Sequence, residues 1–199
     1  INSAFKKVIF NKTNAKNTIL YKKVDLSNRK SIKNLFNNLK NQYSKIDVLI
    51  NCAGIQHVDP VESFPDTKWE QILNVNLSSS FYTSKYVLPL MKKNKWGRIV
   101  NIGSASSYAG FKNTIAYCAS KHGILGMSLA MHDELKEFGV RVYCISPSST
   151  QGKMGLETKG QDYTTFLDPK EVSDYVLFAI AQDGNAMSQE IFIKRMYLR

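Results

Sequence analysis

Two kinds of hydrophobic spacing alternate along this chain. Short runs rich in apolar residues, typical of buried β-strands, cover residues 19–24, 46–50, 98–102, 140–145 and 190–194. Between these runs, apolar residues recur every three or four positions, which predicts amphipathic helices. Those helices are expected near residues 5–9, from Ser27 or Asn28 to Tyr43, over 69–91 in two pieces, over 114–138, and from Asp168 onward.

This alternation predicts a single α/β domain over residues 1–199. Strands that are apolar nearly throughout, separated by amphipathic helices, indicate a Rossmann-like, doubly wound parallel sheet. Ligands of such sheets bind beyond the carboxyl ends of the strands. Four of the expected strands are followed there by polar or small residues, at Asp25, Asn51 to Gly54, Ser104 and Pro147. A binding site is therefore expected at this edge of the sheet.

Composition narrows the class of protein. The 199 residues are 43% hydrophobic, which is enough for one core. No apolar run approaches the roughly 18 residues of a membrane span, and the start does not resemble a secretory signal. Cys52, Cys118 and Cys144 lack the spacing of a metal site. Reduced thiols, a cytoplasmic location and no bound metal are expected.

The chain is strongly basic, with a net charge of +11 from 27 Lys and Arg against 16 Asp and Glu. Such an excess can bind nucleic acid or attract an anionic ligand. Here the lysines are scattered among asparagines rather than among aromatic stacking residues, and no recognition motif accompanies them. A solvated basic surface is expected, with neither nucleic acid nor a membrane as partner.

Tyr117 and Lys121 are the main candidates for chemistry. A step of four residues places both side chains on one face of a helix, about 5–6 Å apart at Cβ. An adjacent ammonium favours the phenolate, so the pKa of Tyr117 is expected to fall and its phenol to exchange protons near neutral pH. Ser104 follows an apolar strand and is placed to reach the same point. An exposed helical Tyr/Lys pair without a function is the alternative.

With these residues the chain resembles the short-chain dehydrogenase/reductase family, from about residue 20 to 195. Residues 51–54, Asn-Cys-Ala-Gly, are similar to the family's Asn-Asn-Ala-Gly turn, and residues 74–77, Asn-Val-Asn-Leu, to its helix motif. Ser104, Tyr117 and Lys121 match the catalytic serine and the Tyr-x-x-x-Lys pair at the usual separation. Tyr-x-x-x-Lys alone is a weak signal, but the combination is specific.

The resemblance implies a role for each residue. Tyr117 would exchange a proton with the substrate oxygen while hydride moves to or from a nicotinamide. Lys121 would lower the tyrosine pKa and hydrogen-bond the nicotinamide ribose, and Ser104 would donate a hydrogen bond to the substrate oxygen. Asn76 would hold a helix kink and a water that relays protons to Lys121. The implied cofactor is NAD or NADP, which carries the hydride chemistry.

The resemblance also implies a set of cofactor contacts. Besides Tyr117 and Lys121, they come from Asp25, Asn51, Ala53, Gly54, Pro147 and Ser148. Asp25 would accept a hydrogen bond from the adenine amino group, and the small residues 53 and 54 would let the backbone approach the cofactor. The family normally chooses between NAD and NADP at the end of its second strand, which has no counterpart here.

Three features depart from the family's pattern. The glycine-rich Thr-Gly-x-x-x-Gly-x-Gly turn has no counterpart, and a first strand–helix–strand unit of roughly 40 residues is missing. That unit would supply the helix start that holds the pyrophosphate, so the chain as written is expected to bind a dinucleotide poorly. A fragment of a normal enzyme is favoured over a natural truncation. Ser148 stands where the family has glycine, and Gly152 where a threonine contacts the carboxamide, with Thr150 as a substitute.

Residues 54–58 suggest the kind of substrate. They resemble the same segment of bacterial 3-hydroxybutyrate dehydrogenases, in which the glutamine matching Gln56 helps hold the substrate carboxylate. The histidine and lysine of that clamp are replaced by Ser106 and Thr114. The ending from Asp168 is more similar to reductases acting on 3-hydroxy acids or 3-oxoacyl groups. A 3-hydroxy or 3-oxo acid or acyl substrate is therefore expected.

Two further expectations concern assembly and activity. The resemblance implies a homodimer or homotetramer built on the helices around 78–93 and 114–138, with Phe81, Leu88 and Met127 in the interface. A catalytically silent scaffold or binding module is the alternative to an enzyme. The missing phosphate turn favours that alternative, whereas retention of all four catalytic positions argues against it.

Overall fold

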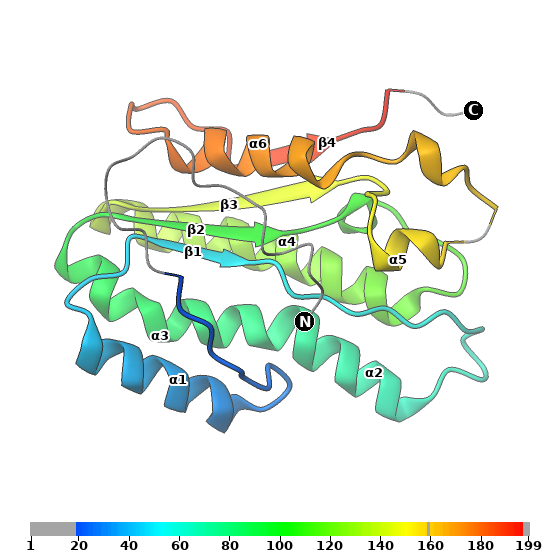
Figure 1. The fold of residues 1–199 in the computed structure, drawn as a ribbon, viewed down its shortest axis with the longest axis horizontal. Coiled ribbons are helices and arrows are strands. Elements are labelled where there is room, and N and C mark those ends of the chain that lie inside the picture. The colour runs from blue at the N-terminus through cyan, green and yellow to red at the C-terminus, as the bar shows by residue number, and fades with distance from the viewer. Residues whose placement is uncertain (1–18, 159, 197–199) are drawn as a thin grey trace.

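The computed structural model describes residues 19–158 and 160–196. Its centre is a four-stranded sheet in the order β1-β2-β3-β4, each strand parallel to its neighbour (Figure 1). The strands are β1 (Val48–Asn51), β2 (Gly97–Ile102), β3 (Val140–Pro147) and β4 (Glu190–Ile193). The parallel direction of the strands is typical of nearly all-apolar strands that are joined by segments containing helices. The expected parallel α/β fold is confirmed.

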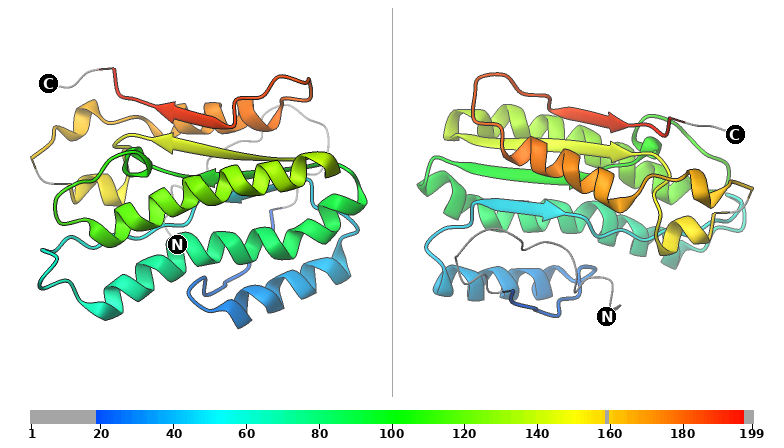
Figure 2. Two further views of the ribbon diagram at one scale, coloured as in Figure 1. Left: turned by 180° about the vertical axis from the view of Figure 1, so that it is seen from behind. Right: turned by 45° about the horizontal axis from the view of Figure 1, so that its top comes forward.

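Helices cover both faces of this sheet (Figure 2). They are α1 (Arg29–Gln42), α2 (Asp66–Leu73), α3 (Ser79–Lys93), α4 (Ile115–Leu135), α5 (Lys153–Leu156) and α6 (Pro169–Ile180). The shorter turns are the π-helix η2 (Asn74–Ser78) and the 3₁₀ turns η3 (Ala105–Ser107), η4 (Lys136–Phe138) and η5 (Tyr163–Thr165). Helices α1, α3 and α4 lie on one side, and α6 lies on the other. The sheet is therefore wound on both faces.

The core consists of two hydrophobic clusters, one on each face of the sheet. The cluster under α1, α3 and α4 contains Ile32, Phe36, Val87, Met91, Ile99, Leu135, Val140 and Val142. The cluster under α6 contains Val100, Tyr143, Ile145, Leu167, Val176, Ala179 and Ile193. Ile99 and Val100 enter opposite clusters because successive strand residues point to opposite faces. Each fully buried aliphatic side chain contributes about 1.5–3 kcal/mol, so the clusters hold the sheet rigid between its two edges.

The ends of the helices follow the local signals in the sequence. Asn28 caps α1 by accepting hydrogen bonds from two backbone N–H groups, and Asp168 forms a capping box at the start of α6. Gly139 ends the α4 segment in the left-handed region, with φ of 71°. A Cβ there would lie 2.1 Å from the carbonyl oxygen of Lys95, so only glycine fits.

The long helical stretch expected over 69–91 occurs in two pieces, as predicted. Helices α2 and α3 are joined by the π-helix η2, whose wider turn inserts an extra residue into the helical ladder. Pro89 does not end α3, which continues to Lys93. The break in the helix therefore falls at the Asn76 motif rather than at the proline.

One predicted strand is wrong. Residues 19–24 have no regular secondary structure, and Ile19, Leu20 and Tyr21 are 54%, 59% and 64% exposed. A strand forms only where a neighbour accepts its backbone hydrogen bonds, and no strand in the described residues pairs with this segment. The helix expected near residues 5–9 lies outside the described part of the chain.

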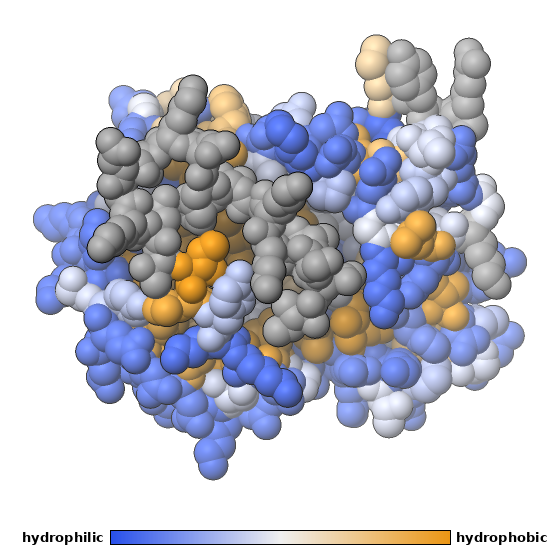
Figure 3. Space-filling model, viewed as in Figure 1, coloured by the Kyte–Doolittle hydropathy of each residue, from blue (hydrophilic) through white to orange (hydrophobic). Residues whose placement is uncertain are grey.

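The surface is mostly hydrophilic. Figure 3 shows a hydrophilic rim with hydrophobic side chains gathered in the middle of one face. Within residues 19–158 and 160–196, no helix is both long and apolar enough to cross a membrane. The same residues contain no group of three or more His, Cys, Asp or Glu side chains arranged to hold a metal ion.

Candidate active site

Ser104 is held immediately beyond the carboxyl end of β2. Its side-chain oxygen accepts a hydrogen bond from the N–H of Ser106 at 3.1 Å, and its own N–H donates to Ser107 Oγ at 3.1 Å. This reciprocal capping of η3 fixes both the backbone and the side chain of the serine. The hydroxyl is therefore positioned before any ligand binds.

Tyr117 and Lys121 reach the same place from α4. The Lys121 Nζ atom lies 5.6 Å from the centre of the Tyr117 ring. The Ser104 side chain is close enough to the phenol to act on its pKa. Lys121 is only 5% exposed, and its Nζ donates to the Ile102 carbonyl oxygen at 2.7 Å. The three residues predicted to act together are thus brought together at the carboxyl edge of the sheet.

The expected direction of the Tyr117 pKa is wrong. Burial raises the pKa of the phenol, and the nearby Ser104 side chain only partly opposes that rise. Burial also lowers the pKa of Lys121 to about 8. The protein interior pushes both groups toward their neutral forms, so the phenol of Tyr117 keeps its proton at neutral pH.

Asn76 lies in the π-helix η2 and is 1% exposed. Its amide bonds both backbone groups of Ile55 at 2.9 Å, and its Nδ2 also donates to Ser120 Oγ at 3.1 Å. These bonds tie the segment after β1 to α4, on the turn that carries Tyr117 and Lys121. The predicted helix distortion is present at Asn76, and the amide itself fixes the loop.

The turn after β1 supplies backbone rather than side chains. Ala53 and Gly54 are exposed, and a Cβ on Gly54 would lie 3.9 Å from Lys121 Nζ. The Asn51 side chain instead turns inward, where it donates to Asn101 Oδ1 at 2.8 Å and accepts from Thr83 at 2.7 Å. Only the backbone of Asn51 remains for a ligand.

The other predicted cofactor residues are more dispersed. Asp25 is exposed and accepts two hydrogen bonds from Ser27, which lower its carboxyl pKa. Within the described residues it makes no hydrogen bond to another candidate site residue. Pro147 pairs with Ile193 in the sheet, and the hydroxyl of Ser148 accepts from the N–H of Arg195 at 3.0 Å. Pro147 and Ser148 lie at the carboxyl edge of the sheet, as expected. The Ser148 side chain, however, is hydrogen-bonded to the segment that follows β4.

Two residues after β3 and the candidate clamp glutamine complete the predicted set. The Thr150 hydroxyl donates to the Ser148 carbonyl at 2.9 Å, so its proton is already in use. Gly152 has φ of 154°, a conformation that a threonine at this position would adopt only with strain. Gln56 is exposed, and its side chain makes no hydrogen bond to any other described residue. Its amide is free to meet a ligand.

Sequence reasoning missed a buried polar network behind the site. Asn101 Nδ2 donates to Ser128 Oγ at 2.9 Å, and the network continues through Asn51 to Thr83 and Ser84. All of these except Asn51 are buried. The signal available was a set of serines and threonines on the inner faces of α3 and α4, but their partners are 27 to 50 residues away.

Comparison with known proteins assigns this arrangement to a class. Residues 2–162 match the family model described as short chain dehydrogenase. The chain therefore belongs to the short-chain dehydrogenase family, as the motifs predicted. The doubly wound parallel sheet, with Ser104, Tyr117 and Lys121 at its carboxyl edge, is consistent with this assignment.

Particular relatives carry more specific names. The chain is 39% identical over 130 residues to D-beta-hydroxybutyrate dehydrogenase of Rhizobium meliloti, covering 65% of this chain and 50% of that protein. It is 34% identical over 124 residues to 3-oxoacyl-[acyl-carrier-protein] reductase FabG of Haemophilus influenzae, covering 62% and 51%. Both matches therefore span about half of the relative's length.

A solved structure shares the fold and a quarter to a third of the residues. It is 4-hydroxyisoleucine dehydrogenase complexed with NADH, with a TM-score of 0.77 and 30% identity. The match covers 86% of this chain and 78% of the other.

Proposed function

We propose that this protein is an NAD- or NADP-dependent oxidoreductase that interconverts a secondary alcohol and a carbonyl. The observation that carries the proposal is the meeting of Ser104, Tyr117 and Lys121 at one point beyond β2. A phenol that lies near a serine hydroxyl and beside a buried ammonium suits proton transfer to a carbonyl oxygen. A Tyr/Lys pair with only a structural role would not need a buried ammonium, because burying the Lys121 charge lowers the stability of the folded protein.

Each of the four candidate catalytic residues has its own role in the proposed reaction. Tyr117, neutral at neutral pH, donates its proton to the carbonyl oxygen in the direction of reduction and takes it back in oxidation. Ser104 donates a hydrogen bond to the same oxygen as negative charge develops. Lys121 stabilises the phenolate that remains, and Asn76 holds the loop and helix at the spacing this requires.

The described residues fit the nicotinamide half of such a cofactor. The exposed backbone of Ala53 and Gly54 adjoins Lys121 Nζ, which uses one donor on the Ile102 carbonyl and keeps two for a ribose hydroxyl. A nicotinamide there would supply or accept the hydride. The similarity to 4-hydroxyisoleucine dehydrogenase complexed with NADH supports this proposal.

A 3-hydroxy or 3-oxo acid or acyl group is the proposed substrate. The relatives named D-beta-hydroxybutyrate dehydrogenase and 3-oxoacyl-[acyl-carrier-protein] reductase act on such groups by name. Gln56, exposed two residues beyond Gly54, is the residue we propose for the carboxylate or thioester carbonyl end.

The test is turnover of 3-hydroxybutyrate and a 3-oxoacyl thioester with NAD and NADP, followed by nicotinamide absorbance. We expect Gln56→Ala to raise KM about tenfold with little change in kcat, because it removes uniform binding of about 1.4 kcal/mol. Gln71→Ala, an exposed glutamine on α2, should change neither constant. Unchanged KM for Gln56→Ala would remove that residue from the clamp. No turnover with either substrate, under conditions in which the chain binds NAD or NADP, would reject this substrate class.

We also propose a homodimer or homotetramer in the cytoplasm. Phe81 on α3 is 44% exposed, and Leu88 and Met127 are half-buried on the same layer of helices, which suits a helix-to-helix contact. The three cysteines are free, in keeping with a reducing compartment. A monomeric mass by light scattering would reject the assembly.

A further inference from the structure

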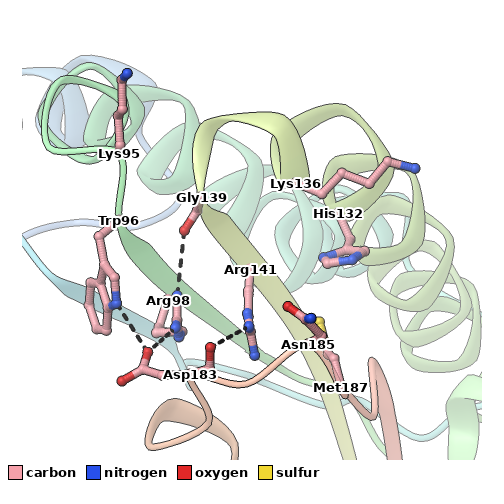
Figure 4. Close-up of a pocket in the computed structure, with 10 residues that line it drawn as sticks. All are labelled: Lys95, Trp96, Arg98, His132, Lys136, Gly139, Arg141, Asp183, Asn185 and Met187. Carbon is pink, nitrogen blue, oxygen red and sulfur yellow. Dashed lines mark hydrogen bonds and ion pairs between the residues drawn. The ribbon is translucent and has the colours of Figure 1, made fainter.

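A hollow of about 490 Å³ lies at the amino-terminal edge of the sheet (Figure 4). It is formed by residues just before β2, β3 and β4 and by the end of α4. Its lining is Lys95, Trp96, Arg98, His132, Lys136, Gly139, Arg141, Asp183, Asn185 and Met187. The six residues of β2 separate its start from the candidate active site by about 20 Å. The hollow is therefore not part of the site described above.

The lining is strongly basic. It contains one carboxylate, Asp183, against four permanent cations: Lys95, Arg98, Lys136 and Arg141. Four positive charges less one negative charge leave a formal excess of three. Lys136 is also paired with Asp133, which lies outside the lining. Figure 4 shows Lys95 and Lys136 extending outward from the rim. The Lys95 side chain could fold over an occupant, whereas Lys136 would first have to leave Asp133.

Arg98 forms the floor, where its guanidinium donates to the backbone carbonyls of Gly97, Gly139 and Gln182 and to one carboxylate. Its side chain is 3% exposed and lies over the Trp96 ring at 4.2 Å. Its one acidic partner, Asp183 at 2.6 Å, is itself 71% exposed and also accepts from the Trp96 indole. The buried Nε–H of Arg98 has no hydrogen-bond partner in the described residues. The carbonyl groups satisfy most of the Arg98 N–H groups, so what remains is the Nε–H and a positive charge that only one solvent-exposed carboxylate offsets.

The walls add neutral and charged donors. His132 Nδ1 accepts from the N–H of Val142 at 3.4 Å, which leaves Nε2 as the protonated nitrogen. Burial lowers the pKa of His132, so the ring stays neutral and keeps this donor at neutral pH. Arg141 holds the carbonyl groups of residues 182–184, and Figure 4 shows its guanidinium beside Arg98 and Asp183.

We propose that this amino-edge hollow binds a small phosphate-class oxyanion that carries two or more negative charges. Such an anion would neutralise the excess charge and accept hydrogen bonds from guanidinium, ammonium and imidazole donors. The volume of the hollow, about 490 Å³, suits a small anion, and the exposed Asp183 carboxylate in its lining disfavours the extended backbone of a nucleic acid. The site is independent of the proposed catalytic function, and neither proposal needs the other.

The test uses Trp96 as a local reporter. The chain has two tryptophans, so Trp69→Phe leaves Trp96 as the single emitter. Inorganic phosphate, pyrophosphate and citrate are each titrated against sodium chloride of matched ionic strength. We expect saturable change in Trp96 fluorescence with pyrophosphate tighter than phosphate; citrate binding as tightly would widen the class to carboxylates and overturn the phosphate assignment.

Variants then separate this hollow from any other anion site. The double variant Lys95→Gln/Lys136→Gln, in which both residues are exposed, should weaken pyrophosphate binding about tenfold or more. Arg141→Gln should do the same. Lys93→Gln is the control. Lys93 is an exposed lysine at the end of α3, two residues before Lys95 and outside the lining, so this variant should bind pyrophosphate as the parent does. Binding unchanged in the double variant, or a response that sodium chloride reproduces, would overturn the proposal.

Discussion

Tyr117→Phe is expected to lower kcat by about 100- to 10,000-fold, the usual contribution of a positioned general acid or base. The substitution removes one hydroxyl and leaves the ring, so the packing of α4 and the proximity of Lys121 are preserved. Substrate KM should change little, because the proton moves only in the transition state. The effect is measured as steady-state turnover of 3-hydroxybutyrate or of the 3-oxoacyl thioester, whichever the parent protein converts faster.

Tyr175→Phe is the matched control for this experiment. Tyr175 lies on α6, on the opposite face of the sheet, and is 45% exposed. It should retain full activity and the same unfolding midpoint. Full activity in Tyr117→Phe would reject the mechanism. No activity in the parent protein would instead favour the silent scaffold, which shares the fold but not the chemistry.

The position of the candidate catalytic residues could be predicted because it depends on general rules of parallel sheets. Each strand run was apolar nearly throughout, and the residue after it was polar or small, so Ser104 and the 51–54 turn had to share one edge. The four-residue step of Tyr117 and Lys121 then needed only a helix, which the apolar spacing and Gly139 supplied. These signals are local, and local signals are what a single sequence contains.

The failures concern quantities set by distant contacts. The sequence predicts a lower pKa for Tyr117 from its neighbour in α4, but the pKa depends on how completely the fold buries the phenol. Arg98 was counted within an apolar strand, yet it is 2% exposed and bonded to Asp183, which is 85 residues away. Residues 19–24 have the composition of a strand but no pairing partner among the described residues.

Lys121→Met is expected to stabilise the protein at pH 7 while abolishing most turnover. Burial lowers the pKa of Lys121 to about 8 from an ordinary value of 10.5. At about 1.4 kcal/mol per pKa unit, the buried ammonium costs roughly 3 kcal/mol. Losing its bond to the Ile102 carbonyl returns roughly 1 kcal/mol of that. A net gain of about 1–2 kcal/mol in the free energy of unfolding should remain.

The sign of the pH dependence makes this prediction specific. Below pH 8 both the folded and the unfolded chain carry the Lys121 proton, so the full cost is present. Between about pH 8 and 10.5 the unfolded chain holds more of the proton than the folded chain, and stability rises with pH. The advantage of Lys121→Met should therefore be largest at neutral pH and shrink as pH approaches 10.

Urea unfolding of parent and variant at pH 7 and pH 10 measures both parts of the effect. Lys112→Met, an exposed lysine in the loop before α4, provides the baseline because it should change stability by less than about 0.5 kcal/mol at either pH. A parent more stable than Lys121→Met at pH 7, or a difference independent of pH, would contradict the prediction. Burial of Lys121 lowers the stability of the protein, so a purely structural role would not explain its position. A gain in stability together with a loss of turnover in one variant would therefore identify Lys121 as functional.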